Sequence, residues 1–243
     1  MAEFINTPFE RNHLLIQEKG MEKLQKATVL ILGVGGVGSY AAESLARSGI
    51  GTLILVDGDS VALSNCNRQI HANLQTIGKS KTQMMKERIH SYHPNCNVIT
   101  YDVFYQEEWN EPLFQNKIDF VVDAIDTMSC KLSIIKYCKE HQIPFISSMG
   151  MANRLDPTQI EITDLSKTSY DPVAKIMRGL IKKNHIKGKI PVVFSKEQPI
   201  VQTQVINENG ETRKQKMPPA SMIFVPAAAG LAIGSYVIKQ LIQ

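Results

Sequence analysis

Cysteine is scarce in this sequence, and the few cysteines lack the spacing that structural zinc sites use. The chain of 243 residues contains Cys66, Cys96, Cys130 and Cys138 at irregular intervals, without a Cys-x-x-Cys pair. This pattern excludes a structural zinc site made of four thiolates. The N-terminus also lacks a secretory signal, and a chain of this length does not depend on disulfide bonds. We therefore expect reduced thiols, no zinc and a cytoplasmic location.

Internal repeats and low-complexity tracts are absent as well, and neither sign of charge dominates. Hydrophobic residues make up 43% of the chain and charged residues 21%, which suits one globular unit with a sizeable core. The formal net charge of +4 permits a polyanionic partner without requiring one.

The only long apolar segment runs from Ile223 to Ile242. It contains Pro226, Lys239 and several small residues, which suit a packed core helix or a dimer-interface helix better than a helix that faces lipid. A membrane span or membrane association is the alternative, because the uncharged run is close to the length that crosses a bilayer.

The first 150 residues alternate between short apolar runs and helical patterns. This order predicts repeated βαβ units, and hence an α/β fold with a doubly wound, mostly parallel Rossmann-like sheet. The expected strands are 27–32, 52–56, 97–101, 118–122 and 144–147, and the expected helices are 38–48, 80–92 and 128–141.

The pattern changes after Gly150. Residues 159–163 alternate between polar and apolar side chains, and residues 190–195 are also typical of a strand. We expect residues 1–150 to form a nucleotide-binding domain. Residues 151–243 are expected to form a smaller appended α+β lobe that contacts the substrate and includes the C-terminal packing helix.

A glycine loop follows the first expected strand. Gly33, Gly35 and Gly38 fit the pattern G-x-G-x-x-G, with Gly36 between them, in the strand-to-helix context where backbone amides face a phosphate. Asp57 ends the next strand, where it can accept hydrogen bonds from a ribose. Glycines that serve only a tight turn are the alternative. The loop predicts a bound nucleotide, and taken alone it favours a dinucleotide.

The residues after Asp57 favour a reaction at phosphorus instead. A dense polar run follows, and a cationic helix start comes next; its candidate nucleotide contacts are Asp59, Asn65, Arg68, Gln69 and Lys81. Displacement at phosphorus requires fixed cations, because negative charge builds on the transferring group and on the departing pyrophosphate. Arg68 and Lys81 are such cations. A solvated helix face is the alternative for either residue alone.

Two aspartates close the strand that ends near residue 122. Ligands of open parallel sheets bind at the carboxyl ends of the strands, and one carboxylate there can hold Mg²⁺. We take Asp126 as the magnesium ligand and Asp123 as the reserve. Capping of the helix that begins near Met128 is the alternative for Asp126.

These motifs resemble the adenylating enzymes related to ubiquitin-activating proteins. The motifs that carry the resemblance are Arg11 with Asn12, GVGGVGSYAAESLARSGIG, LVDGDSVALSNCNRQ, TIGKSK and DAIDT. The resemblance implies that Asp57 binds the ATP ribose, that Arg68 and Lys81 bind phosphates, and that Asp126 binds Mg²⁺. It further implies that Arg11 reaches the γ-phosphate in a neighbouring subunit, and hence a homodimer.

The chain departs from the members of this family that activate sulfur-carrier proteins. Their two Cys-x-x-Cys pairs are missing, and no cysteine follows Cys138, where a thioester or persulfide nucleophile would be expected. The acceptor of the adenylate is then expected to lie within the substrate. In this respect the chain resembles the branch that cyclises threonylcarbamoyladenosine at position 37 of certain tRNAs, with net loss of water. Further matches to that branch are Ser148–Gly150, Arg154–Pro157, Lys167-Thr168, Asp171-Pro172 and Val193–Glu197.

The basic stretch from Lys175 to Lys189, with Tyr170 before it, agrees with a tRNA substrate, since phosphate contacts and base stacking both contribute to RNA binding. A solvated surface segment is the alternative, and it is the stronger interpretation when the charges are taken alone. No DNA partner is expected. A monovalent cation and sulfur-transfer partners such as a cysteine desulfurase are left open.

Two other functions remain possible from the sequence. One is adenylation of the C-terminus of a sulfur-carrier or ubiquitin-like protein, which the missing cysteines weaken. The other is a non-catalytic, nucleotide-bound adaptor for tRNA or sulfur-transfer proteins. Arg11, Arg68, Lys81 and Asp126 argue against the adaptor, because an adaptor needs only the glycine loop.

Overall fold

The computed structural model describes residues 7–202 and 219–243 and contains one seven-stranded sheet in the order β3-β2-β1-β4-β5-β7-β6. All neighbouring strands are parallel except β6 and β7, which pair antiparallel. The strands are β1 (Thr28–Leu32), β2 (Thr52–Val56), β3 (Asn97–Tyr101), β4 (Phe120–Asp123), β5 (Phe145–Ser148), β6 (Ile160–Asp164) and β7 (Pro191–Ser195).

The central strands are apolar along their whole length because helices cover both faces of the sheet. In β1, Val29 and Ile31 belong to the core on one face, whereas Leu30 and Leu32 belong to the core on the other. Continuous apolar runs of this kind are typical of parallel sheets that are buried on both sides. This pattern made the strands recognisable in the sequence, and the predicted doubly wound α/β fold is confirmed.

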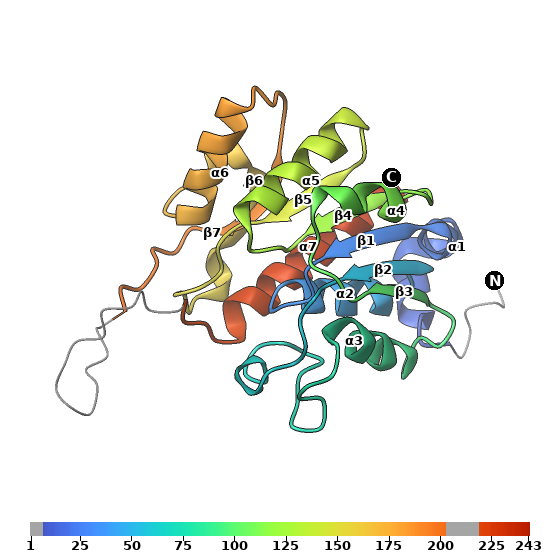
Figure 1. Cartoon of the computed structure of the whole chain (residues 1–243). Coiled ribbons are helices and arrows are strands. Elements are labelled where there is room, and N and C mark those ends of the chain that lie inside the picture. The colour runs from blue at the N-terminus through green and yellow to red at the C-terminus, as the bar shows by residue number, and fades with distance from the viewer. Residues whose placement is uncertain (1–6, 203–218) are drawn as a thin grey trace.

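Helices form a layer on each side of the sheet (Figure 1). The first layer contains α1 (Glu10–Lys26), α2 (Gly38–Arg47), α3 (Lys81–His90) and α7 (Phe224–Ile242). The second contains α4 (Asn110–Leu113), α5 (Met128–Glu140) and α6 (Pro172–Lys183). Short 3-10 helices lie at Leu63–Asn65, Glu107–Trp109, Pro157–Gln159 and Leu165–Lys167.

The boundary that we expected at residue 150 is not a break in the sheet. Strand β7 pairs in parallel with β5, and β6 then pairs antiparallel with β7, so both strands extend the sheet built by the first 150 residues. Helix α7 returns to the first half of the chain and packs against α2. The residues after 150 are therefore joined to the first part by a shared sheet and a shared core. The assignment of ATP to the first part and tRNA to the second stays a prediction.

Helix α7 is a core helix in this fold. By length and composition it is the one helix among the described residues that could cross a membrane. Its glycines, however, lie against α2: a Cβ atom on Gly230 would come within 2.4 Å of the Val37 carbonyl oxygen, and one on Gly234 within 2.0 Å of Ser44 Oγ. Only glycine permits such a close approach of two helices. The small residues of the segment are thus explained by helix packing.

The strand order reverses direction between β1 and β4. From β1 the chain proceeds outward through β2 and β3, and it then returns to the other side of β1 with β4 and β5. In open parallel sheets, ligands bind in the crevice beyond the carboxyl ends of the two strands at such a switch point. The glycine loop after β1 and the aspartates at the end of β4 both lie there.

Candidate nucleotide-binding site

The glycine loop connects β1 to α2 in a turn that tolerates no side chain at two of its positions. Gly33 has a positive φ of 86°, and a Cβ atom on it would lie 2.7 Å from the Ala124 carbonyl oxygen. A Cβ atom on Gly38 would lie 1.8 Å from the carbonyl oxygen of Gly33. At Gly35, in contrast, nothing lies within 4 Å of the corresponding position. The loop is therefore tight on the protein side and open at Gly35, as the approach of a phosphate requires.

The Asp57 carboxylate is fixed beside this loop. Its Oδ2 atom accepts a hydrogen bond from the Val34 amide at 2.7 Å, and its Oδ1 atom accepts one from the Asp59 amide at 2.9 Å. The carboxylate thus holds the glycine loop and the start of the polar run that follows β2. Each of its oxygens still has capacity for a second hydrogen bond, so the geometry permits the expected contact with a ribose.

Lys81 lies close to the same carboxylate. Its Nζ atom is 2.6 Å from Asp59 Oδ2 and 3.9 Å from Asp57 Oδ1, and the residue is only 5% exposed. Lys81 is the first residue of α3, where the helix dipole disfavours a positive charge. The two aspartates offset this effect. Hydrogen bonds from Ser80 and Thr82 to Asp102 fix the start of the helix and therefore the direction of Lys81.

The other polar residues of the run surround the start of α2. The stem of Arg68 packs against the glycine loop, with its Cγ atom 3.6 Å from the position that a Cβ of Gly36 would occupy. Asn65 is buried, and its side chain accepts a hydrogen bond from the Ala62 amide. Gln69 is 6% exposed, and its Oε1 atom has no hydrogen-bond partner among the described residues.

The two aspartates at the carboxyl end of β4 have different environments. Asp123 is 1% exposed, and its Oδ2 atom is bonded to Lys131 Nζ at 3.0 Å and to Ser147 Oγ at 2.5 Å. Asp126 is exposed, and the one hydrogen bond found for its carboxylate in the described part of the chain comes from the Thr127 hydroxyl. Asp123 is therefore occupied by structural bonds and is not a suitable reserve ligand. Asp126 caps no helix and has oxygens free for a cation.

Arg11 is not near the other candidate residues in the same chain. Its neighbour Asn12 donates a hydrogen bond to the carbonyl oxygen of Arg47, at the C-terminal end of α2. The glycine loop lies at the opposite end of this helix of 10 residues, about 15 Å away at 1.5 Å per residue. The structure thus brings together the glycines, Asp57, Asp59, Arg68 and Lys81, but it leaves Arg11 apart.

Sequence reasoning missed three residues that shape this edge of the sheet. Lys131 and Ser147 hold Asp123, which in turn accepts a hydrogen bond from the Ile125 amide and so fixes the loop that carries Asp126. Phe104 covers Gly58, where a Cβ atom would come within 2.7 Å of its ring, and it is 65% exposed. Of these three residues, only Phe104 could have been assigned to this edge from the sequence, because it comes just after the carboxyl end of β3. A lysine inside an amphipathic helix gives no such signal.

His71 is a buried histidine near Lys81 and is 3% exposed. Neither ring nitrogen has a hydrogen-bond partner among the described residues. Burial, with the positive charges of Lys81 and Arg88 as smaller causes, lowers the pKa of His71 to about 4. The imidazole is therefore neutral in the folded protein at neutral pH.

Lowering the pH from 7 to 5 should destabilise the protein through His71. In the unfolded chain the imidazole has its ordinary pKa of 6.5, so it binds a proton in this range, whereas the folded state does not until the pH approaches 4. The stability that the neutral imidazole contributes is therefore present above pH 6.5 and is lost as the pH falls. At pH 5 the free energy of unfolding should be lower by about 2 kcal/mol. Urea unfolding at both pH values measures this difference, and His71→Gln should remove that share of it. An unchanged pH dependence in the variant would contradict the assignment.

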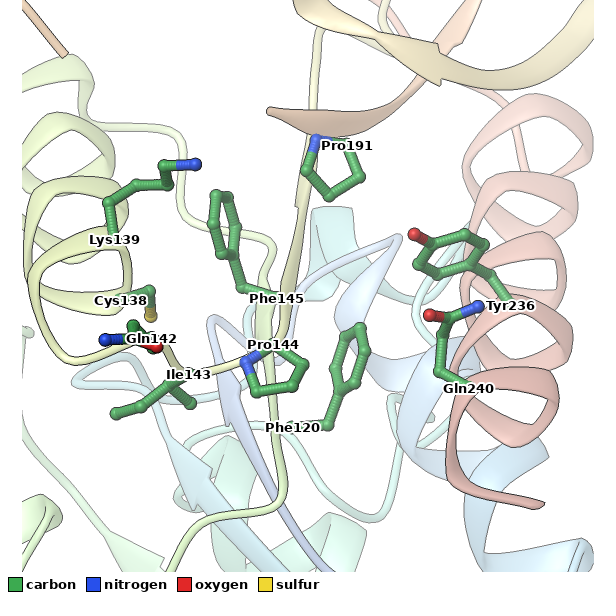
Figure 2. A pocket seen from close by; sticks show the side chains of 10 residues that line it. All are labelled: Phe120, Cys138, Lys139, Gln142, Ile143, Pro144, Phe145, Pro191, Tyr236 and Gln240. Carbon is green, nitrogen blue, oxygen red and sulfur yellow. The ribbon is translucent and has the colours of Figure 1, made fainter. Parts of the chain in front are cut away.

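A pocket of about 350 Å³ lies at the opposite edge of the sheet (Figure 2). It opens between the C-terminal end of α5 and helix α7, with Phe120 and Phe145 at the starts of β4 and β5 and Tyr236 across from them. The amino ends of the strands surround this pocket, whereas the glycine loop and the aspartates lie at the carboxyl ends. It is therefore not the nucleotide site.

The residues at the carboxyl edge fit a nucleoside triphosphate with a divalent cation. The open side of Gly35 admits a ligand group, Arg68 and Lys81 supply positive charge, and the exposed Asp126 carboxylate can serve a metal. This arrangement places the chain among the Rossmann-like proteins that bind a nucleotide at the switch point. More specifically, the chain belongs to the ThiF family, whose family model matches residues 9–243.

Individual relatives are similar over nearly the whole chain. The chain is 48% identical over 240 residues to a tRNA threonylcarbamoyladenosine dehydratase of Bacillus subtilis (strain 168), a match that covers 97% of this chain and 94% of the relative. A crystal structure of E. coli tRNA N6-threonylcarbamoyladenosine dehydratase in complex with ATP superposes with a TM-score of 0.85 at 34% identity, covering 96% of this chain and 93% of that one. The complex of the E. coli protein with AMP gives a TM-score of 0.86 at 34% identity and the same coverage.

Proposed function

We propose that this chain is an ATP-dependent dehydratase that cyclises threonylcarbamoyladenosine at position 37 of tRNA through an acyl-adenylate. The observation that carries the proposal is the similarity to a tRNA threonylcarbamoyladenosine dehydratase over 97% of the chain. The geometry of the carboxyl edge supports it, because the glycine loop, two cations and an exposed carboxylate lie at the same edge of the sheet. A tRNA substrate is also consistent with a soluble cytoplasmic enzyme.

In the first step, the carboxylate of the threonyl group attacks the α-phosphorus of ATP and pyrophosphate leaves. Asp57 is the residue that binds the ribose, and Arg68 and Lys81 bind the phosphates. Both cations are suited to this role because each is held in place, Arg68 by packing on Gly36 and the buried Lys81 by its ion pair with the half-exposed Asp59. Asp126 would hold Mg²⁺, which would supply positive charge beside the phosphate oxygens.

In the second step, the carbamoyl group of the same side chain attacks the activated carbonyl carbon and AMP leaves, so that one water is lost overall. The thiols of the protein support an acceptor within the substrate. Cys96 and Cys138 are 3% and 1% exposed, and burial raises the pKa of both, to about 12 for Cys96. Cys66 packs beside Val61, Ala72 and Met84. A buried, protonated thiol is a poor nucleophile, which disfavours adenylate transfer to the enzyme.

Arg11 acts in the active site of a second subunit. In its own chain it lies at the far end of α2 from the glycine loop, and no hydrogen bond or ion pair holds it in the described part of the chain. The neighbouring Leu14 and Leu15 on α1 are 64% and 83% exposed, and adjacent exposed leucines beside a candidate active-site arginine suit a subunit interface. The functional unit is accordingly a homodimer in which each site is completed by the partner.

Mass spectrometry of the tRNA tests the reaction. Purified protein is incubated with ATP, Mg²⁺ and tRNA that carries threonylcarbamoyladenosine, and the digested nucleosides are weighed. We expect the modified nucleoside to lose the mass of one water while AMP appears in equal amount. Unchanged nucleoside, with AMP formed only after addition of a sulfur-carrier protein, would instead identify a carrier-activating enzyme. The absence of AMP under both conditions would leave a nucleotide-bound adaptor.

A further inference from the structure

A second pocket, of about 540 Å³, opens at the same edge of the sheet as the glycine loop. Its lining includes Tyr170, Lys175 and Arg178, with Gln198 and Pro199 from the segment after β7. The Gly150 amide, just beyond the carboxyl end of β5, donates a hydrogen bond to Asp171 Oδ2 at 3.1 Å. Strand β5 is two positions from β1, which corresponds to about 10 Å across the sheet. The pocket is thus a near neighbour of the nucleotide site.

We propose that this pocket, and not the whole basic stretch, is where the RNA loop docks: an unpaired base stacks on Tyr170, and the adjoining phosphates lie against Lys175 and Arg178. The proposal rests on the proposed function for the identity of the RNA. It assigns a binding surface to residues that the adenylation chemistry does not use.

Tyr170 is exposed, but its backbone is firmly held. Tyr170 as a whole is 60% exposed, and its backbone has a positive φ of 51°. Its carbonyl oxygen accepts a hydrogen bond from Nη2 of Arg154, which is 3% exposed and also donates to the carbonyl oxygens of Gly150 and Glu197. An aromatic ring on a fixed backbone costs little conformational entropy when a base stacks on it.

The charge in the pocket is positive. Lys175 is exposed, and neither Lys175 nor Arg178 forms an ion pair within the described residues. Arg178 is oriented by its hydrogen bonds to the carbonyl oxygen and hydroxyl of Thr168. The one acidic residue of the lining, Asp171, is 4% exposed and lies 3.8 Å from Arg154, so its charge is already matched. Phosphate groups complement what remains.

The other lysines of the stretch lie elsewhere. Helix α6 continues for five residues beyond Arg178, so its last residue, Lys183, lies about 8 Å further along the helix axis from the pocket. Lys187 and Lys189 follow that end, and the Lys189 carbonyl oxygen contacts Lys139 near the C-terminus of α5, just before β7 begins at the amino edge of the sheet. These two lysines therefore lie toward the amino edge of the sheet, opposite the edge where the chemistry takes place. They provide a matched control with the same charge and similar exposure.

The proposal can be tested by filter binding. The full-length protein and its variants are titrated against tRNA that carries threonylcarbamoyladenosine. Tyr170→Ala should raise the Kd about tenfold because base stacking is lost, whereas Tyr170→Phe, which keeps the ring, should stay within about twofold. Lys175→Ala should weaken binding by a few fold and lower the slope of log K against log salt by about 0.7. Lys187→Ala should change neither quantity. The Kd for ATP should be the same in all four variants.

Two results would overturn the docking site: an unchanged Kd in Tyr170→Ala, or a loss in Lys187→Ala equal to that in Lys175→Ala. The second result would mean that charge alone attracts the RNA. Failure of the proposed function is distinguished by the wild-type protein. If it binds tRNA through Tyr170 but removes no water, the reaction is wrong and the docking site stands. If it removes water while Tyr170→Ala binds normally, only the docking site is wrong.

Discussion

Asp126→Asn should lower the rate of AMP formation by about a hundredfold to a thousandfold while leaving the stability of the protein nearly unchanged. The side chain is exposed and its carboxylate accepts one hydrogen bond, from Thr127, so its removal leaves no buried group unpaired. Asparagine keeps the size of the side chain but loses the charge that a magnesium ion requires. The rate is measured from AMP release at saturating ATP and Mg²⁺, and the stability from urea unfolding.

Asp123→Asn is the matched comparison, since it makes the same change three residues earlier. Asp123 and Lys131 are both 1% exposed and form an ion pair, so the substitution leaves a buried lysine without a counter-charge. The expected cost is about 3–5 kcal/mol in the free energy of unfolding. If Asp126→Asn instead unfolds the protein, or if it retains full activity at low Mg²⁺, then Asp126 is not the metal ligand.

The contrast between these two aspartates shows where sequence reasoning reaches its limit. Asp123 ends β4 and Asp126 follows it in the motif Asp123-Ala124-Ile125-Asp126, and nothing in the motif tells which carboxylate points inward. The answer depends on Lys131 and Ser147, which come from the following helix and the neighbouring strand. Long-range packing decides the role, and local sequence does not contain that information. The individual roles of the site residues remain predictions for the same reason.

The fold itself could largely be predicted. The strands Thr52–Val56 and Asn97–Tyr101 were expected with the bounds that the structure has, because their apolar runs end at turn-forming or polar residues. The helices α1 and α6 were not expected. Helix α6 begins with the cap of Asp171 and with Pro172, a clear start signal, but its many lysines suggested an exposed segment. The pairing of β6 and β7 with the main sheet also needs contacts between residues far apart in sequence.

Mixing two inactive variants should restore activity if Arg11 completes the site of a partner subunit. Arg11→Ala and Asp126→Asn should each be nearly inactive as homodimers, since each removes one charge that stabilises the transferring phosphate. In a mixed dimer, one site contains the intact Arg11 of one chain and the intact Asp126 of the other, while the second site carries both defects. Random exchange makes half of the dimers mixed, so about a quarter of the wild-type activity should return.

The position of Arg11 in the structure makes this a sharp test. The hydrogen bond from Asn12 to the Arg47 carbonyl oxygen fixes this part of α1 at the far end of α2, so a small movement cannot carry Arg11 to the glycine loop of its own chain. Activity of the mixture is measured as AMP release after the two variants have exchanged subunits, and sedimentation reports the dimer. As a control, Arg11→Ala mixed with the double variant Arg11→Ala/Asp126→Asn contains no intact Arg11 and should stay inactive. The mixture of Arg11→Ala with Asp126→Asn could instead show no more activity than the mean of the two variants alone. That result would place Arg11 in the site of its own chain and remove the reason for a functional dimer.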